Sequence, residues 1–415
     1  MGVAQRLRSW LGDPLLVITV IGLTLFGVAM IYSAGQLERP DPSVAGAWRM
    51  QFIWLGISLT ILVITMRIPV RWLEWIALPA YIVGLLVLAA TLVIGTGGGT
   101  AASMKGWLRV GGFAVQPSQF ANVATVLMLG RTMGAWRENP QAVWDLWKPI
   151  VIAIVPMMLV LAQPDLGTAM VFGGVLLATL YWAGTPLGIL FLLLSPALGL
   201  AFAYVGTWIY SIYMILLCAF LWLYRARLSE WVVVLLLNVA MGTIAWPLWN
   251  SLEDYQQMRL VSFVNPELDR QGSGYQVIQS KVAIGSGGLF GQGFNEGPHK
   301  RLRFLPEQHT DFIYAVIGEE TGLIGAGLVL LAFLVILWRL VKLAERLPDP
   351  FAGIVVFGIA GAWFTHILVN VGMTLGVMPV TGIPLPFLSY GGSFLLASFI
   401  ALGVAQRVAL EHGRI

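Results

Sequence analysis

Hydrophobic residues fall along the chain in long uninterrupted runs separated by short polar segments, without the strict alternation of a half-buried strand. An α-helix needs about 20 apolar residues to cross the hydrocarbon core of a bilayer, so each long run predicts a membrane span. The runs lie at 15–33, 51–67, 74–95, 118–135, 149–163, 166–183, 186–205, 207–224, 231–250, 312–338, 351–377 and 390–410. The pattern predicts an all-α, polytopic membrane helix bundle with about twelve transmembrane helices.

The amino-acid composition is typical of a membrane protein and argues against several other classes of protein and site. The chain is 58% hydrophobic and only 11% charged, with a formal net charge of +4. Most Lys and Arg residues lie between the apolar runs, where they set orientation, so the positive balance does not predict a nucleic-acid partner. The single cysteine, Cys218, lies within an apolar run, which excludes an intrachain disulfide and a cysteine-based metal site.

Positive charge occurs in every second gap between runs, which predicts that both termini face the cytoplasm. We expect the first run to be a retained span rather than a cleaved signal peptide, because it is long and no good cleavage site follows it. The clusters are Arg6/Arg8, Arg67/Arg71, Arg131/Arg137/Lys148, Arg225/Arg227, Arg339/Lys342/Arg346 and Arg407/Arg414. Segments 96–117 and 251–311 then fall outside, and the second forms a large extracytoplasmic loop.

Chemistry-bearing residues gather where this outer loop meets the next span, in RLRFLPEQHTDFIYAVIGEETGL (301–323). Asp311 directly precedes the apolar run, so it either caps that helix or faces protein at the membrane edge. In the second case desolvation raises its pKa and makes it a better base near neutral pH. Glu307 and His309 either orient Asp311 or are ordinary loop residues. Glu319 and Glu320 lie inside the next helix, and we expect each of them to belong to a structural pair.

Basic residues cluster in the same outer region, at Arg259, Lys281, Lys300, Arg301 and Arg303. Such a patch indicates an anion, either a lipid headgroup or a pyrophosphate. The glycine-dense segment 285–297 does not have the spacing of a dinucleotide motif, so it is either a tight loop or a place where backbone N–H groups approach a phosphate.

Three further segments carry polar or irregular chain where apolar residues are expected. In KGWLRVGGFAVQPSQF, Trp107 and Arg109 present an aromatic face and a cation, although Trp107 alone is typical of an interfacial anchor. In LAQPDLGTAM, Asp165 is expected to cap a helix below the surface, which implies a cavity. In MPVTGIPLPFLSYGGS, Ser389 and Tyr390 end a proline-rich stretch that cannot face lipid, so it must fold over or line a pocket on the outer side.

These motifs, together with GYQVIQSKVAIGSGGLFGQGF, resemble in the same order the hallmark motifs of the SEDS family of shape, elongation, division and sporulation proteins. The resemblance spans essentially the whole chain. Segments GYQVIQSKVAIGSGG, LPEQHTDF and PVTGIPLPF are more similar to the RodA branch, which acts in elongation, than to the FtsW branch.

The resemblance implies a peptidoglycan glycosyltransferase that polymerises lipid II on the outer face of the bacterial cytoplasmic membrane and releases undecaprenyl pyrophosphate. It implies a class B penicillin-binding protein and other elongation-complex membrane proteins as partners, and a divalent cation (Mg²⁺ or Mn²⁺) as a candidate cofactor. Asp311 would be the catalytic base or a ligand of that cation. The residues expected to bind substrate are Trp107, Arg109, Asp165, Gln279, Ser280, Lys281, Glu307, His309, Ser389 and Tyr390.

Two departures from the family pattern stand out within this single domain, 1–415. Gln119 and Asn122 replace the Glu and Lys that the family usually has after QPS, and we interpret them as a neutral hydrogen-bonding pair in place of an ion pair. The family has ten spans, so the three runs within about 186–250 predict an inserted helix pair.

Two other functions fit the same features. A transporter or flippase for a lipid-linked precursor also needs a polar cavity, but its charges should continue toward the cytoplasm, whereas here they concentrate outside. A noncatalytic scaffold for the transpeptidase would tolerate changes at Asp311.

Overall fold

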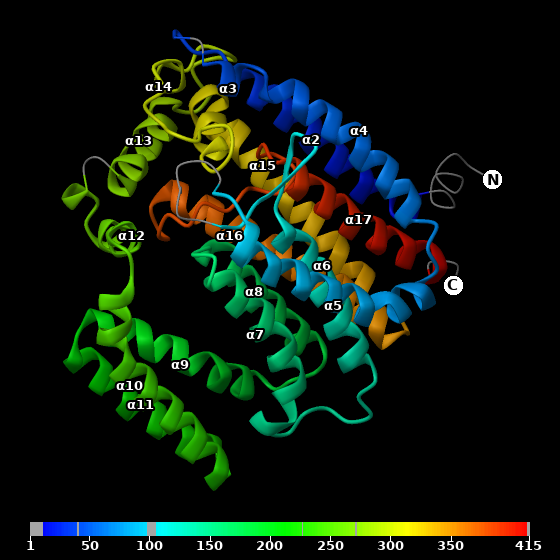
Figure 1. Ribbon diagram of the computed structural model, residues 1–415, viewed down its shortest axis with the longest axis vertical. Coiled ribbons are helices and arrows are strands. Elements are labelled where there is room, and N and C mark those ends of the chain that lie inside the picture. Colours follow the sequence, from blue (N-terminus) through cyan, green and yellow to red (C-terminus); the bar gives the residue numbers. More distant parts are fainter. Residues whose placement is uncertain (1–10, 40, 98–104, 226, 270–271, 413–415) are drawn as a thin grey trace.

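Figure 1 shows a computed structural model of the chain, which describes residues 11–39, 41–97, 105–225, 227–269 and 272–412. The terminal charges Arg6, Arg8 and Arg414, used above to orient the chain, lie outside the described residues. The described chain is a bundle of helices with one small hairpin.

Long helices account for most of the described chain, and short elements occupy the connections. The long helices are α2 (Pro14–Ala34), α4 (Ala47–Thr65), α5 (Val70–Ile94), α6 (Pro117–Gly134), α7 (Trp147–Leu161), α8 (Leu166–Trp182), α9 (Leu187–Val205), α10 (Thr207–Tyr224), α11 (Leu228–Ser251), α15 (Ile313–Glu345), α16 (Pro350–Leu375) and α17 (Gly392–His412). The short elements are α3 (Pro42–Ala45), η1 (Val143–Leu146), α12 (Asp254–Val264), η2 (Pro266–Leu268), α13 (Ser273–Ser286), α14 (Pro298–Arg301) and the antiparallel strands β1 (Leu108–Val110) and β2 (Phe113–Val115).

Each apolar run of the sequence forms one of the long helices. Among the described residues, ten helices are long and apolar enough to cross a membrane, with α7 counted together with the adjoining η1 (Val143–Leu161), and α6 and α8 fall short of that standard. Helix α8 has only 17 residues, and α6 carries buried polar side chains such as Gln119 and Asn122. Both pack inside the bundle, where a helix does not need a fully apolar surface. The chain is a multi-pass membrane protein.

Helices α16 and α17 form the centre of the bundle. In their most apolar windows 72% and 78% of residues are buried, against 17% for α5, α10 and α11. Small residues bring α8 and α16 together: a Cβ on Gly361 would lie 2.3 Å from the Ala178 side chain, and one on Gly174 would overlap Thr365. Close backbone approach of this kind is the usual basis of helix packing in a membrane.

Helices α9, α10 and α11 form an arm that stands beside the main bundle (Figure 1, green). A buried polar cluster holds the arm together: Asn238 donates to Ser195 Oγ (2.9 Å) and accepts from the Tyr213 hydroxyl (3.0 Å). The arm covers the segment where we expect an inserted helix pair, and the insertion itself stays a prediction.

The two ends of the described chain meet at one end of the bundle. The Asp13 N–H donates to Gln406 Oε1 (2.7 Å), and the Asp13 carboxylate pairs with Arg339 (2.6 Å). At the other end of α2, the Ala34 carbonyl accepts from Gln308 of the outer loop (2.8 Å). The expected catalytic loop therefore lies at the end of the bundle opposite the termini, as the alternation of positive charge requires.

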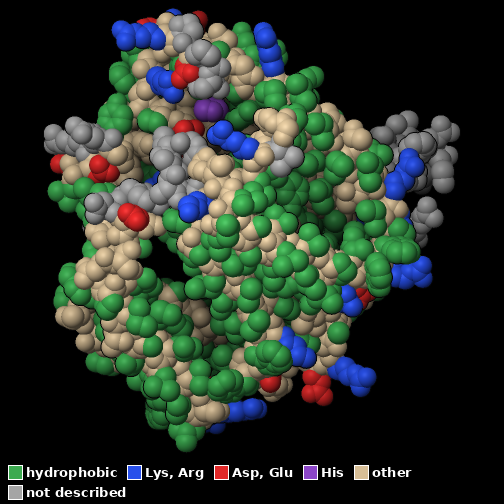
Figure 2. All heavy atoms as spheres, viewed as in Figure 1, with side chains coloured by type: hydrophobic (Ala, Val, Ile, Leu, Met, Phe, Trp, Pro, Cys, Tyr) green, Lys and Arg blue, Asp and Glu red, His purple; other side chains and the backbone are tan. Residues whose placement is uncertain are grey.

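Figure 2 shows hydrophobic side chains over the middle of the face in view, with charged side chains at its top and left side and at its right and lower edges. A band of this kind is expected where lipid surrounds the protein.

Candidate functional site

A groove of about 680 Å³ opens at the end of the bundle opposite the termini. Its walls come from the β1–β2 hairpin, α4, α12, the loop before α15 and the proline-rich loop before α17. The lining includes Trp54, Trp107, Arg109, Phe113, Gln116, Arg259, Arg303, Glu307, Gln308, His309, Asp311, Gly382 and Tyr390. Of the site residues expected from the sequence, the groove therefore brings together Asp311, Trp107, Arg109, Glu307, His309 and Tyr390.

The backbone around Asp311 is fixed from three directions. The Glu307 carbonyl accepts from the Asp311 N–H (3.1 Å), with Glu307 itself at φ +52°. Asn370 Nδ2 on α16 donates to the Asp311 carbonyl (2.9 Å), and Ser389 Oγ donates to the carbonyl of Thr310 (2.5 Å). A clamped backbone holds the carboxyl group in one place, as a catalytic group requires.

Asp311 does not cap α15. The N-cap residue is Phe312, without a side-chain capping bond, so the capping alternative is wrong. The carboxyl group instead faces the groove, with Oδ2 lying 3.1 Å from where a Cβ on Gly382 would be. Gly382 has φ +74° and no side chain, which leaves this approach to Asp311 open.

Burial and, to a smaller extent, the nearby Glu307 carboxylate raise the pKa of Asp311 to about 7, against the opposing effect of Arg259. Burial also lowers the pKa of His309. At neutral pH Asp311 is therefore poised between its two protonation states, and a neutral His309 lies in the same groove.

Asp165 lies behind the groove wall. Its carboxylate caps α8 by accepting from the Thr168 N–H (2.9 Å), as expected from the sequence, and it also accepts from Gln116 Nε2 (3.0 Å). Burial raises the pKa of Asp165. Asp165 does not line the groove, but both residues that donate to its carboxylate, Gln116 and Thr168, do, so Asp165 supports the groove wall through them.

The remaining expected substrate residues lie outside the groove lining. Ser280 is buried and donates to the Thr374 carbonyl (2.8 Å), and Lys281 lies against Gly376, so this part of α13 packs on the end of α16. Gln279 lies between them. Ser389 supports the loop before α15 by donating to the Thr310 carbonyl. Their contact with substrate stays a prediction.

Lys300 does not belong to an exposed anion-binding patch. It is fully buried, 2.5 Å from Glu320, and it also donates to the Ser33 carbonyl (2.9 Å). Burial lowers the pKa of Lys300. Glu319 pairs with His299 (3.0 Å), so each of the two adjacent glutamates belongs to a structural pair, as expected, and each anchors the α14 segment.

The glycine-dense segment 285–297 is a tight loop against α15. A Cβ on Gly291 would lie 2.0 Å from the Glu320 carbonyl, and one on Gly287 the same distance from the Gly318 carbonyl. Close packing on a neighbouring helix explains these glycines.

Sequence reasoning missed the polar residues of α16 that support the site. Asn370 bridges the Asp311 and Ile383 carbonyls, and His366 Nδ1 donates to the Pro384 carbonyl (3.1 Å). They are one turn apart, so one face of α16 holds both the catalytic loop and the proline-rich loop. Buried polar residues within an apolar run were the available signal.

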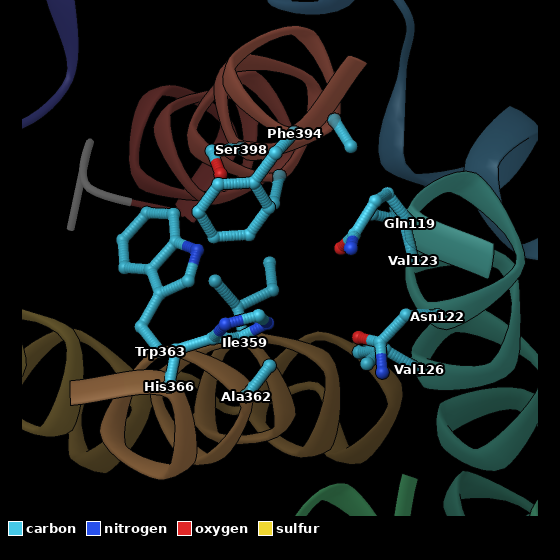
Figure 3. A pocket seen from close by; sticks show the side chains of 12 residues that line it. Gln119, Asn122, Val123, Val126, Ile359, Ala362, Trp363, His366, Phe394 and Ser398 are labelled. Carbon is cyan, nitrogen blue, oxygen red and sulfur yellow. The ribbon is translucent and has the colours of Figure 1, made fainter. Parts of the chain in front are cut away.

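A second, small cavity of about 30 Å³ lies between α6, α16 and α17 (Figure 3). Gln119, Asn122 and His366 point into it, and it has room for water. The expected Gln119–Asn122 hydrogen bond is wrong: Gln119 Nε2 donates to Gln116 Oε1 (3.1 Å), and Asn122 Nδ2 has no partner in the described chain. Phe394 lines both cavities and separates them.

A family model described as a cell cycle protein, FtsW/RodA/SpoVE, matches residues 13–216 and 205–413. The chain is 32% identical to the peptidoglycan glycosyltransferase RodA of Treponema pallidum, with 95% of this chain and 97% of that protein covered. It is 32% identical to the probable peptidoglycan glycosyltransferase FtsW of Trichlorobacter lovleyi (96% and 93%) and 31% identical to the peptidoglycan glycosyltransferase MrdB of Escherichia coli (95% and 93%).

Solved structures have the same fold. A chain of a peptidoglycan synthase complex, described as coordinating polymerization and crosslinking, has a TM-score of 0.69 at 28% identity over 97% of this chain and 99% of that one. A mutant of the rod shape determining protein RodA of Thermus thermophilus has a TM-score of 0.63 at 25% identity, with the same coverage.

Proposed function

Because the chain belongs to the FtsW/RodA/SpoVE family of cell cycle proteins, we propose that it is a peptidoglycan glycosyltransferase that polymerises lipid II, with Asp311 as its catalytic base. The activity has the support of relatives matched over nearly their whole length, and the structural neighbour is part of a peptidoglycan synthase complex. The observation that carries the assignment of the site is a carboxyl group of raised pKa in a groove that also contains arginines.

In the proposed reaction a hydroxyl oxygen of the acceptor sugar attacks C1 of the donor sugar. As the new C–O bond forms, the hydroxyl proton passes to Asp311, whose pKa near neutrality suits this transfer. The bond from C1 to the phosphate oxygen breaks, and its electron pair leaves with undecaprenyl pyrophosphate. Protonated Asp311 then returns the proton to water.

The leaving group gains negative charge as that bond breaks, and cations around it lower the barrier. Arg109, Arg259 and Arg303 line the groove from three separate segments. Arg259 is also close enough to Asp311 to oppose the rise in its pKa. We therefore assign the diphosphate to the side of the groove at Arg259, with Arg109 and Arg303 nearer the rim.

A divalent cation fits this groove only together with substrate. The described residues contain no cluster of three or more His, Cys, Asp or Glu side chains suited to a metal. Mg²⁺ is commonly held by one or two carboxylates plus substrate phosphates and water, so Asp311 and Glu307 would supply the protein ligands. When bound, the cation would offset diphosphate charge.

The cellular setting follows from the same relatives. We propose that both termini face the cytoplasm, that the groove opens on the outer face, and that the chain acts with a class B penicillin-binding protein during elongation. Matches to both RodA and FtsW proteins at 32% identity support the shared chemistry more directly than the elongation role.

The test is glycan synthesis by purified protein supplied with lipid II, with and without the transpeptidase and with EDTA. Asp311→Asn should abolish the polymer. Glu296→Gln changes an exposed carboxylate of the same outer loop that does not line the groove, and it should leave the polymer unchanged. Full activity of the Asp311→Asn variant would favour a scaffold, and headgroup translocation without polymer would favour a transporter.

A further inference from the structure

We propose that Trp54, with Phe113 at its edge, forms a platform in the groove on which a pyranose ring of the lipid-linked substrate stacks. This inference rests on the proposed function, since it assigns a sugar-binding subsite to the same groove. Both residues line the groove. Phe113 lies within the segment KGWLRVGGFAVQPSQF, whereas Trp54 belongs to none of the motifs singled out from the sequence.

The platform is built from elements far apart in the chain. Trp54 lies on α4 and Phe113 begins β2 of the hairpin; their ring centroids are 5.3 Å apart at an interplanar angle of 75°. This edge-to-face arrangement braces the indole and leaves a ring face uncovered by Phe113. Trp54 is half-buried and Phe113 is 40% exposed, so the pair is partly open to the groove.

The indole ring of Trp54 packs directly against the backbone of Gly392. A Cβ on Gly392 would lie 2.1 Å from Cε2 of the indole and 2.2 Å from Nε1, so the ring rests on the bare backbone at the start of α17. Gly392 is the second glycine of the SYGGS segment, and this contact gives a reason for a residue without a side chain there. The neighbouring Gly391 has only an ordinary contact, 3.7 Å from Phe394 Cβ.

The same segment ties the platform to the catalytic loop. Gln51, one turn before Trp54, accepts from the Gly391 N–H (3.1 Å) and donates to the Ser389 carbonyl (3.2 Å). The Tyr390 N–H donates to the His309 carbonyl (2.9 Å), two residues before Asp311. The indole and the catalytic carboxyl group are therefore positioned by one continuous set of contacts.

A sugar is the ligand whose chemistry matches this platform. The C–H groups of a pyranose ring are weakly positive and pack on the negative face of an aromatic ring. The Trp54 indole N–H makes no hydrogen bond within the described chain, which leaves a donor at the ring edge for a sugar hydroxyl. An isoprenoid tail would pack on apolar surface but would not use that donor, and the diphosphate is better matched by the arginines.

The experiment compares the binding of two ligands to the full-length protein: lipid II, and undecaprenyl pyrophosphate, which lacks the sugars. Trp54→Ala should weaken lipid II binding on the order of tenfold. Binding of undecaprenyl pyrophosphate should be unchanged, which also shows that the variant is folded. Trp54→Phe, which keeps an aromatic face, should retain most of the lipid II affinity.

Two matched pairs of variants sharpen the comparison. Gly392→Ala should displace the indole and reproduce the loss of lipid II binding. Gly56→Ala, on the same helix as Trp54 but outside the groove lining and with open space for the added methyl group, should bind as the wild type does. On α4, Phe52 is 58% exposed and outside the groove, so Phe52→Ala should also leave binding unchanged.

The proposal is overturned if Trp54→Ala binds lipid II as tightly as the wild type does, or if that variant loses both ligands equally. Polymerisation by the wild type is scored separately. Suppose that Trp54→Ala weakens lipid II binding as predicted but the wild type makes no polymer. That result would refute the proposed function and leave the sugar subsite in place.

Discussion

At the residue scale, the proposed reaction depends on the protonation of Asp311. Its carboxyl group is surrounded by protein and lies near Glu307, and both effects favour the neutral form. Arg259 and Thr310 act in the opposite direction. The balance leaves the pKa at about 7, where the group both accepts a proton readily and releases it.

Polymerisation should therefore depend on the protonation of Asp311. As pH falls through about 7 the carboxylate becomes protonated and loses its capacity to accept the acceptor's proton, so the rate should fall, with an apparent pKa of about 7. Initial rates with saturating lipid II between pH 5.5 and 8.5 measure this. A flat profile down to pH 5.5 would rule out Asp311 as the base.

The same pKa predicts an effect on stability. A carboxyl group whose pKa is higher in the folded state binds more protons there than in the unfolded chain, so it destabilises the fold as pH rises from about 4 to about 7. Asp311→Asn removes this cost. The variant should unfold at a higher temperature than the wild type at pH 8, with a smaller difference at pH 5, as measured by thermal unfolding in detergent; an equal difference at both pH values would contradict the argument.

At the element scale, helices place the site through a few buried polar contacts. The α14 segment is fixed to α15 and to the end of α2 by Lys300, which lies between Glu320 and the Ser33 carbonyl. Gln308 then joins the Lys300 and Ala34 carbonyls to the catalytic loop. The loop before Asp311 thus depends on a buried ion pair.

Removing one partner of that ion pair should lower the free energy of unfolding more than removing both partners. Lys300→Met leaves the buried Glu320 carboxylate without its cation and should destabilise the protein by about 3–5 kcal/mol. The double variant Lys300→Met/Glu320→Leu should recover most of that loss in a denaturation experiment. If the two substitutions were simply additive, the pair would not be coupled.

Helix α6 offers a second test. Gln119→Glu places a carboxylate at a buried site within hydrogen-bond reach of Gln116, close to Asp165, and should destabilise by on the order of 3 kcal/mol. Adding Asn122→Lys, whose side chain enters the same small cavity, should restore stability by pairing with it. Thermal unfolding of the single and double variants measures this, and further damage from the second substitution would contradict it.

At the scale of the whole molecule, the groove is assembled from α4, the hairpin, α12 and the loops before α15 and α17, all at the end opposite the termini. The arm of α9–α11 stands apart from this assembly and has its own buried polar cluster around Asn238. The arm should therefore respond to damage independently of the central helices.

Asn238→Leu removes the partner of both Ser195 and Tyr213 and should loosen the arm alone. Hydrogen exchange measured by mass spectrometry should increase in α9–α11 and stay unchanged in α15–α17. Ser211→Ala removes an exposed hydroxyl of α10 and serves as the control. Faster exchange throughout the bundle would show that the arm is part of the central cooperative unit.

The sequence by itself determined the helices and the end of the bundle at which the polar loops gather. Both follow from local rules: a span needs a continuous apolar run, and basic residues alternate with the spans. These rules involve only residues that are close together in the sequence, so they can be applied without knowing the fold. The position of Asp311 at a helix mouth made it a candidate, and the family resemblance rather than a local rule indicated its role.

Only the tertiary structure decided which polar groups meet. Lys300 looks like part of a cationic patch until α15 supplies Glu320, and Gln119 bonds to Gln116 rather than to Asn122. Trp54 and Gly392 are separated by most of the chain, yet the indole lies on that glycine. Pairings of this kind depend on how the helices pack. Each polar side chain has many compatible partners, and small differences in packing decide which one it meets, so a local sequence pattern cannot predict the pairing.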